Sequence, residues 1–409
     1  MNLNSLNEAR TTREGSRLYS PDLKEYPTVK AHSFDEWSPL REVIVGTSAG
    51  YEAHDMELSF RLFFNDVAHS SFYYPSFDAR HPLDAVDSRR PLNDRYVKEL
   101  AEDLEDFADA LAAAGVVVHR PDPLGARGLF TTPDWEATMI PALNVRDQTI
   151  VLGDEILETS CQVRARSYES DLLKPIFSRY FREGSRWTSM PRPRLLDRSF
   201  DTSYVSGRAT PAIEDVGDSD GSAADFEIMI DGAQCIRLGR DIVVNVATAN
   251  HALGARWLAA HLEGRFRVRV MDRFADNHID SLVLPLRPGL LLLRNHGVAD
   301  RLPAPLQRWD KIYAPEPQSH NFPSYDADDL IVSSPYIDMN VLSIDENTVV
   351  ANSLFPELIT TLEGRGFTVI PVRHRHRRLF GGGFHCFTLD IVRDGGDEYY
   401  FDEREWADA

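Results

Sequence analysis

The feature that most constrains the fold is an order of elements that recurs five times along the 409 residues. Each unit contains a short apolar run of the kind that forms a buried strand. A stretch with hydrophobic residues at helical spacing follows it, and a second extended stretch comes after that. The apolar runs are EVIVG (42–46), TIVLG (149–153), DIVVN (241–245), GLLLL (289–293) and TVVAN (348–352).

The stretches between these strands carry the marks of helices. Leu100, Leu104, Phe107 and Leu111 fall on one helical face, and Gly115 follows as a stop signal. Five similar units predict an α/β protein that closes into one quasi-repeating assembly. A doubly wound α/β sheet, which also alternates strands and helices, is the competing interpretation. The four further helices are expected around 172–177, 253–262, 306–309 and 358–362.

Three segments lie outside this periodicity. Residues 1–35 show no clear period and are expected to form an N-terminal arm, which leaves 36–393 as a single domain. Residues 394–409 are acidic with aromatics and are interpreted as a solvated C-terminal tail with an aromatic anchor. Residues 213–224 are small, acidic and Gly-containing, which predicts a surface loop.

Charge and cysteine usage narrow the partners and the compartment. A net charge of −20 argues against nucleic acid as a partner and suits a cationic substrate. Three cysteines give no disulfide framework, which favours a reducing, cytoplasmic compartment. No apolar run approaches the roughly 18 residues that cross a membrane, and the N-terminus lacks the apolar core of a secretory signal.

One of the three cysteines follows a glycine run, in GGGFHCFTLD (381–390). Glycines let the backbone approach another chain segment or a ligand closely. Cys386 is then either a small buried hydrophobe or an exposed nucleophile. A nucleophilic cysteine needs a base or a positive neighbour to become a thiolate near neutral pH.

Polar residues cluster near the ends of the units. His278 and Asp280 are two apart, so in an extended chain they face the same side. Several carboxylates around one thiol disfavour the thiolate unless the substrate itself is positive, and a guanidinium fits carboxylates best. Taken singly, each such residue is more often a cap, a turn residue or a structural histidine. The set is Asp147, Asp231, His278, Asp280, Ser333, Ser334 and Cys386.

Seven motifs in order resemble a known family. They are EWSPLREVIVGT, NVRDQTIVLGDEILE, YFREGSRWTSMPRP, IRLGRDI, HIDS, SSPYIDMNVLSIDE and GGGFHCFTLD. Together they resemble the arginine-dependent amidinotransferases, which include the glycine and inosamine-phosphate amidinotransferases, from about Trp37 to Arg393. The resemblance implies the pentein fold, a five-bladed α/β propeller of pseudo-fivefold ββαβ units.

The resemblance also implies roles for the polar set. Cys386 would be the nucleophile that carries the amidino group, His278 the general acid and base, and Asp231 the residue that orients His278 or the substrate. The implied reaction is ping-pong: L-arginine leaves its amidino group on the cysteine, L-ornithine departs, and an acceptor amine takes the group. No metal or organic cofactor is implied, and the family suggests a homodimer at most. Substrate binding would fall to Asp147, Asp280, Ser333 and Ser334.

Departures from the family pattern leave the acceptor open among glycine, another amino acid such as lysine, and an amino-cyclitol or natural-product amine. Gln234 replaces an acid, Asn277 replaces an apolar residue, and Gly297 stands where glycine amidinotransferase has an arginine, with Arg294 and Arg301 nearby. The run RHRHRR (373–378) would meet an anionic acceptor or be a solvated basic loop.

Three other functions remain open at this point. The first is a deiminase-like guanidine hydrolase of the same fold, with water as the acceptor. The second is a binding protein without catalysis. In the third, the cysteine of GGGFHC serves packing alone.

Overall fold

The computed structural model describes residues 29–52, 55, 57–63, 92–126, 128–203, 225–325 and 331–407. Residues 1–28 of the expected arm and the expected loop at 213–224 lie outside the described residues. In the described part of the chain, no helix has the length and apolar character needed to span a membrane.

Among the described residues, five three-stranded sheets repeat one pairing pattern. In the second unit, β5 (Thr149–Leu152) pairs antiparallel with β6 (Glu155–Glu158), and β6 pairs parallel with β7 (Arg186–Ser189). Three other units repeat this order of one antiparallel and one parallel pairing. Their strands are β8 (Cys235–Leu238), β9 (Asp241–Val246) and β10 (Arg267–Asp272); β11 (Val283–Arg287), β12 (Leu290–Leu293) and β13 (Asp310–Tyr313); and β14 (Leu342–Asp345), β15 (Thr348–Asn352) and β16 (Thr368–Val372).

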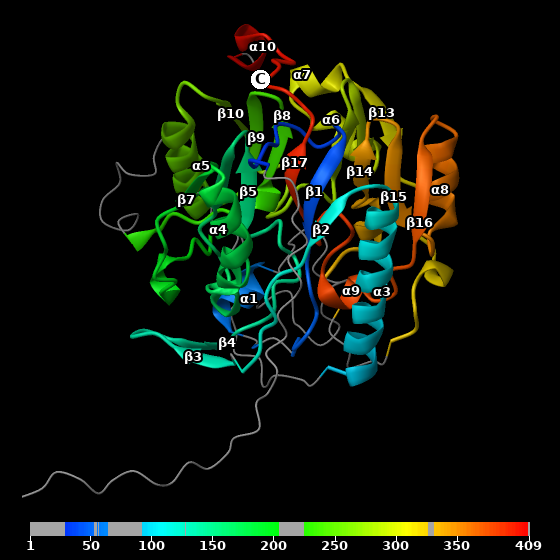
Figure 1. Ribbon diagram of the computed structural model, residues 1–409. Helices are drawn as coiled ribbons and strands as arrows, with labels where there is room; N and C mark the ends of the chain where they lie inside the picture. The colour runs from blue at the N-terminus through cyan, green and yellow to red at the C-terminus, as the bar shows by residue number, and fades with distance from the viewer. Residues whose placement is uncertain are drawn as a thin grey trace, which may run out of the picture.

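The first unit joins the two ends of the described chain. β17 (Thr388–Arg393) pairs antiparallel with β1 (Leu40–Val45), and β1 pairs parallel with β2 (Val117–His119). Figure 1 shows β1 in blue beside β17 in red near the middle of the molecule. The prediction of five closing units is therefore confirmed. The doubly wound sheet is wrong, because no sheet among the described residues exceeds three strands.

Helices cover the outside of the sheets (Figure 1). A parallel connection between the second and third strand of a unit needs a crossover, and each crossover here contains a helix. In α3 the apolar face is buried as predicted, and Asn93 caps the helix by accepting a bond from the Arg95 N–H. The crossover helices are α3 (Asp94–Ala113), α4 (Lys174–Arg182), α5 (Ala249–Leu262), α6 (His296–Asp300) with α7 (Ala304–Gln307), and α8 (Pro356–Glu363).

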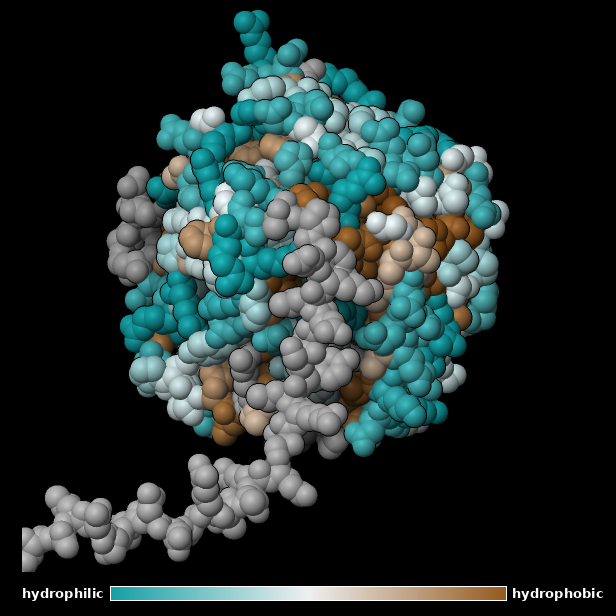
Figure 2. All heavy atoms as spheres, in the orientation of Figure 1, coloured by the Kyte–Doolittle hydropathy of each residue, from teal (hydrophilic) through white to brown (hydrophobic). Residues whose placement is uncertain are grey.

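Burial orders the strands from the centre outward. The first and second strands of the units are almost wholly buried, whereas the third strands are partly exposed. Figure 2 shows hydrophilic residues over most of the viewed face, with apolar ones in smaller patches between them. Apart from short 3₁₀ helices, the remaining described elements are α1 (Leu58–Phe63), α9 (Arg377–Phe380), α10 (Glu403–Ala407) and the hairpin of β3 (Leu129–Thr131) and β4 (Glu136–Thr138).

The apolar run of the second unit takes a different position in its sheet from the other four runs. Four of the runs form the middle strand of their sheet, but TIVLG forms the first strand, β5. The middle strand is EILE, whose two glutamates are both buried. Glu155 accepts bonds from His261 and Arg265, and Glu158 accepts one from the Trp187 indole. Distant partners thus allow an acidic segment to occupy a buried strand.

Both expected ends pack onto the described core. His32, Ser33 and Asp35 form isolated bridges with Val392, Gly153 and Leu238. In the tail, Tyr399 bridges to Gly239 and Phe401 is buried. The boundaries at residues 35 and 393 remain predictions.

Candidate active site

A cavity of about 280 Å³ gathers most of the polar set. Loops that precede or follow the strands of several units supply its walls. Asp231 lies beside this wall and is joined to it through a bond with His278. The predicted residues that line the cavity are Asp147, His278, Asp280, Ser333, Ser334 and Cys386.

The glycine run brings Cys386 into this wall by close backbone contact. Helix α9 ends at Phe380 and is capped by Gly381, which has the left-handed conformation that favours glycine (φ 66°). A Cβ on Gly383 would lie 2.7 Å from the Cβ of Asn340, so any larger residue would push the two segments apart. The close approach lets the Asn340 side-chain oxygen accept the Cys386 N–H at 2.9 Å. The Cys386 thiol then donates to Asp280 Oδ2 at 3.3 Å.

His278 stands between two carboxylates. Its Nε2 donates to Asp231 Oδ2 at 3.0 Å, and its Nδ1 lies 3.7 Å from Asp147 Oδ1. The ring of Phe63 packs edge-on against it. Burial lowers the pKa of His278, but Asp147 and the bond to Asp231 outweigh it, with help from Asp280, and raise the pKa to about 9. The imidazole is therefore protonated at neutral pH.

Asn245 holds the loop that carries His278. Its side-chain oxygen accepts the N–H groups of Phe274 and Ala275, both at 3.1 Å. Its amide nitrogen donates to the carbonyls of Ala275 at 2.8 Å and Asn277 at 2.6 Å. The sequence interpretation missed Asn245. The available signal was a polar residue inside the apolar strand DIVVN, where a buried amide requires partners.

Two carboxylate oxygens near His278 have no hydrogen-bond donor. Asp147 Oδ2 accepts from Arg166 at 2.6 Å, but Asp147 Oδ1 and Asp231 Oδ1 are buried without a hydrogen-bond partner in the described part of the chain. Burial raises the pKa of Asp147, and the charges of His278 and Arg166 only partly offset it. Buried acceptors without donors are costly, so these oxygens mark a place for a ligand that donates hydrogen bonds.

The thiol and its neighbouring carboxylate have opposite pKa shifts. Burial, together with the charges of Asp280 and Asp147, raises the pKa of Cys386 well above its usual value. These surroundings favour the neutral thiol over the thiolate. Burial also raises the pKa of Asp280, but the bond and charge of His385 and the charge of His278 outweigh this and bring it to about 2. Asp280 therefore keeps a negative charge beside the sulfur.

Ser333 and Ser334 are buried in the cavity wall and are already hydrogen-bonded. Ser333 donates to the Arg377 carbonyl at 3.1 Å. Ser334 accepts the Tyr336 N–H at 3.1 Å, at the start of a 3₁₀ turn. Their bonds fix the position of the two hydroxyl groups on the wall.

The departures from the family pattern have distinct surroundings. Gln234 accepts the Asp231 N–H at 2.9 Å and donates to the Asn245 carbonyl at 2.9 Å, so it supports Asp231. Asn277 lines the cavity and donates to the Phe63 carbonyl at 2.6 Å. Gly297 is not part of the lining, whereas Arg294 and Arg301 are.

The basic run at 373–378 neither lines the cavity, where it could meet an anionic acceptor, nor forms a simple solvated loop. Arg373 and Arg375 both bond Asp103 on α3, and Arg377 is fully buried against Asp338 at 2.6 Å. These carboxylates neutralise the run, which joins α3 to the segment before Cys386 rather than lining the cavity. Sequence order concealed this, because Asp103 lies about 270 residues away.

Comparison with known proteins decides the family. No protein-family model matches the sequence. Inosamine-phosphate amidinotransferase 1 of Streptomyces glaucescens is 32% identical over 368 residues, which cover 90% of this chain and 97% of that protein. The chain belongs to the amidinotransferase family. The structure of the inosamine-phosphate amidinotransferase of Streptomyces griseus agrees, with a TM-score of 0.74 at 32% identity, covering 90% of this chain and 99% of that one.

The fold extends beyond the amidinotransferases. A dimethylarginine dimethylaminohydrolase shares it with a TM-score of 0.52, over 86% of this chain and 99% of that one. Its identity of 14% shows likeness of fold alone. The amidinotransferase thus has the expected pentein fold, and its five ββαβ units are those traced above.

Proposed function

We propose that this amidinotransferase moves the amidino group of L-arginine to an acceptor amine through an amidino-cysteine on Cys386, and releases L-ornithine. One observation carries the proposal. A buried thiol, a protonated histidine and Asp147 Oδ1, which has no hydrogen-bond donor among the described residues, border one cavity. A guanidinium is the cation whose N–H groups and plane best match such carboxylates.

The donor guanidinium fits between Asp147 and Asp280 in this proposal. Its positive charge offsets the two carboxylates that raise the pKa of Cys386, so substrate binding favours the thiolate. The enzyme then has a reactive nucleophile only when the donor is present. This accounts for a nucleophilic cysteine whose own surroundings favour the neutral thiol.

Two half-reactions follow, and their protons balance. The Cys386 sulfur bonds to the guanidinium carbon, and the bond from that carbon to the ornithine nitrogen breaks. That nitrogen takes one proton from His278 and the proton that the thiol lost, so ornithine leaves as an ammonium. The incoming acceptor ammonium returns both protons. One goes to neutral His278, which frees the lone pair for attack, and one goes to the departing sulfur.

The charge of the cavity wall restricts the class of acceptor amine but does not identify the acceptor. Glycine, another amino acid such as lysine, and an amino-cyclitol or natural-product amine all remain candidates. Arg294 and Arg301 on the cavity wall favour an acceptor that bears a carboxylate or phosphate. The two inosamine-phosphate amidinotransferases named above act on an inosamine phosphate, which is one such amine. We expect a cytoplasmic enzyme that works as a monomer or a homodimer.

The test is incubation with L-arginine alone, followed by intact-mass measurement and peptide mapping. The proposal predicts one added amidino group on Cys386 and an equal amount of ornithine. Cys235→Ala, which removes another buried cysteine, should label as well as the wild type. Citrulline and ammonia without a lasting label would instead indicate the hydrolase. No label and no product would indicate either a different guanidino donor or a binding protein.

A further inference from the structure

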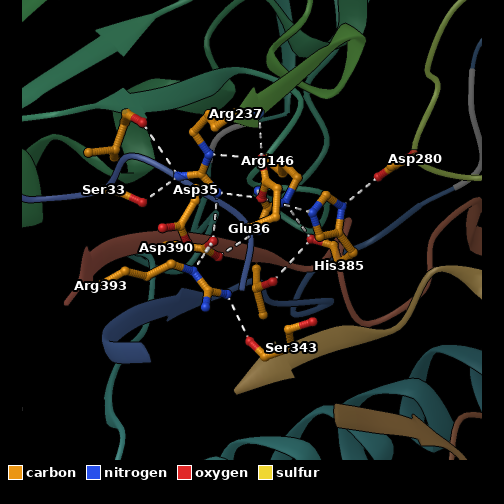
Figure 3. A network of polar contacts seen from close by, with 12 residues as sticks. Ser33, Asp35, Glu36, Arg146, Arg237, Asp280, Ser343, His385, Asp390 and Arg393 are labelled. Carbon is orange, nitrogen blue, oxygen red and sulfur yellow. Dashed lines mark hydrogen bonds and ion pairs between the residues drawn. The ribbon is translucent and has the colours of Figure 1, made fainter. Parts of the chain in front are cut away.

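His385, the residue before the nucleophile, lies in a buried chain of polar contacts that the reaction above does not use. Each of its ring nitrogens faces a carboxylate. Nδ1 bonds Asp280 Oδ2 at 2.8 Å, and Nε2 lies 3.4 Å from Glu36 Oε2 (Figure 3). His385 is 5% exposed. The ring therefore connects the carboxylate beside the thiol with a carboxylate in the protein interior.

Glu36 is fixed in place on the far side of the ring. Arg237 donates to it three times, from Nη2 at 2.5 Å, from Nε at 2.9 Å and from its main-chain N–H at 3.1 Å. Arg146 approaches the same carboxylate at 3.4 Å and also donates to the main-chain carbonyl of His385 at 2.8 Å. Both the ring and the backbone of His385 are thus held by charged side chains.

The same cluster joins the units of the propeller at its centre. Asp390 on β17 accepts from Arg146 at 2.6 Å, from Arg237 on β8 at 2.7 Å and from Arg393 at 2.7 Å. Arg393 in turn donates to the Ser343 carbonyl on β14 (Figure 3). These residues come from or adjoin four units, and Asp280 precedes the first strand of the remaining one. Moving His385 would disturb charges that every unit helps to hold.

Asp280 depends on His385 for its orientation. Its Oδ2 accepts both the His385 Nδ1–H and the Cys386 thiol, so one oxygen serves both residues. The histidine is the charge-assisted partner at the shorter distance, and such bonds are strong enough to fix a carboxylate rotamer. Without His385, the Asp280 carboxylate loses the shorter of the two hydrogen bonds that Oδ2 accepts and keeps weaker restraints on its rotation.

We propose that His385 is a positioning residue, which holds the Asp280 carboxylate against the Cys386 sulfur so that its other oxygen meets the donor guanidinium. The role rests on the proposed function for its effect on substrate. His385 does not touch the reacting atoms. It transmits the rigidity of the Glu36–Arg237 cluster to the cavity through one ring.

Two substitutions of His385 distinguish the contact made by Nδ1 from the contact made by Nε2. The amide nitrogen of asparagine takes the place of Nδ1, so His385→Asn should keep the bond to Asp280. The longer glutamine places its amide near Nε2, so His385→Gln should keep only the Glu36 side. The matched pair His119→Asn and His119→Gln alters another histidine that bonds a carboxylate, Glu42 at 2.8 Å, outside the cavity lining.

Two measurements report on Asp280. The first is the KM for L-arginine, which we expect to rise about 10- to 100-fold in His385→Gln and only a few-fold in His385→Asn, as for loss of one bond to a charged group. The second is the pH midpoint for alkylation of Cys386 by iodoacetamide. Because Asp280 raises the pKa of the thiol, the midpoint should fall in His385→Gln and stay near the wild-type value in His385→Asn.

Equal effects of the two His385 substitutions, or no shift of the alkylation midpoint, would overturn the proposal in favour of simple packing. The alkylation measurement needs no turnover, so it still decides the role of His385 if the amidino label is not found. If both variants fail to fold, long-range ¹H–¹⁵N spectra of the wild type replace them. Hydrogen on Nδ1 of His385 supports the proposal, and a bare Nδ1 refutes it.

Discussion

Replacing Asp231 by asparagine should shift the pH dependence of the first half-reaction. In the proposed reaction His278 must be protonated to release ornithine, and its pKa of about 9 depends on the charges of Asp147 and Asp231. Asp231→Asn keeps the size of the side chain but removes the negative charge 3.0 Å from Nε2. The rate should then be lost at a lower pH than in the wild type.

The size of the shift follows from the contact. An opposite charge within about 4–6 Å shifts a pKa by about 1–3 units, so His278 should fall from about 9 to about 6–8 in Asp231→Asn. The contribution of His278 to the free energy of unfolding also depends on pH. Because the folded pKa is raised, the stabilisation is complete below the unfolded pKa of about 6.5 and is lost as the pH rises through 9. The rise of the His278 pKa from 6.5 to about 9 corresponds to about 3 kcal/mol of stability.

The assay is single-turnover release of ornithine at low L-arginine from pH 6 to pH 10, which reports the pKa of the free enzyme. Asp241→Asn is the matched control, because Asp241 is also a buried, paired carboxylate but bonds Arg269 on β10, outside the cavity lining. The control should keep the wild-type midpoint. If Asp231→Asn also loses activity only near pH 9, the carboxylate does not set the pKa of His278 and the assignment is wrong.

Two further predictions concern the nucleophile and a turn. Cys386→Ala should reduce ornithine release by about 10³-fold or more while thermal unfolding stays near that of the wild type; turnover at the wild-type rate would exclude an amidino-cysteine. Gly239→Ala should lower the free energy of unfolding by about 2–5 kcal/mol, because φ is 65° and the new Cβ would overlap the Glu398 carbonyl. Gly115→Ala, with φ 86° and open space around it, should cost only about 1–2 kcal/mol; equal losses in a denaturant titration would contradict the steric argument.

The units could be recognised from the sequence because the spacing of apolar residues is set within each helix or strand. The apolar face of α3 and the runs at 241–245 and 348–352 became a buried helix face and two middle strands, since each segment satisfies its own backbone and needs only a core to pack against. The strand EILE escaped notice. Its glutamates contradict a buried strand until His261, Arg265 and Trp187 are placed beside them.

The residues of the candidate site also fall into those that the sequence indicated and those that it did not. The spacing of His278 and Asp280 and the motif around Cys386 pointed to one cavity, because chemistry restricts which residues can be used there. The residues that hold these side chains in place could not be recognised from the sequence. Glu36 and Arg237 are 201 residues apart, and Asn340 is 46 residues from Cys386.

By itself, then, the sequence determined the five-unit plan, the crossover helices and the residues available for guanidinium chemistry. Only the tertiary structure decided which strand of each unit faces the centre, how the basic run at 373–378 is neutralised, and what holds Asp280 beside the thiol. The physical reason is that burial removes water from charged groups and makes each depend on a specific partner. In a closed ring of units, those partners come from segments far apart in the chain.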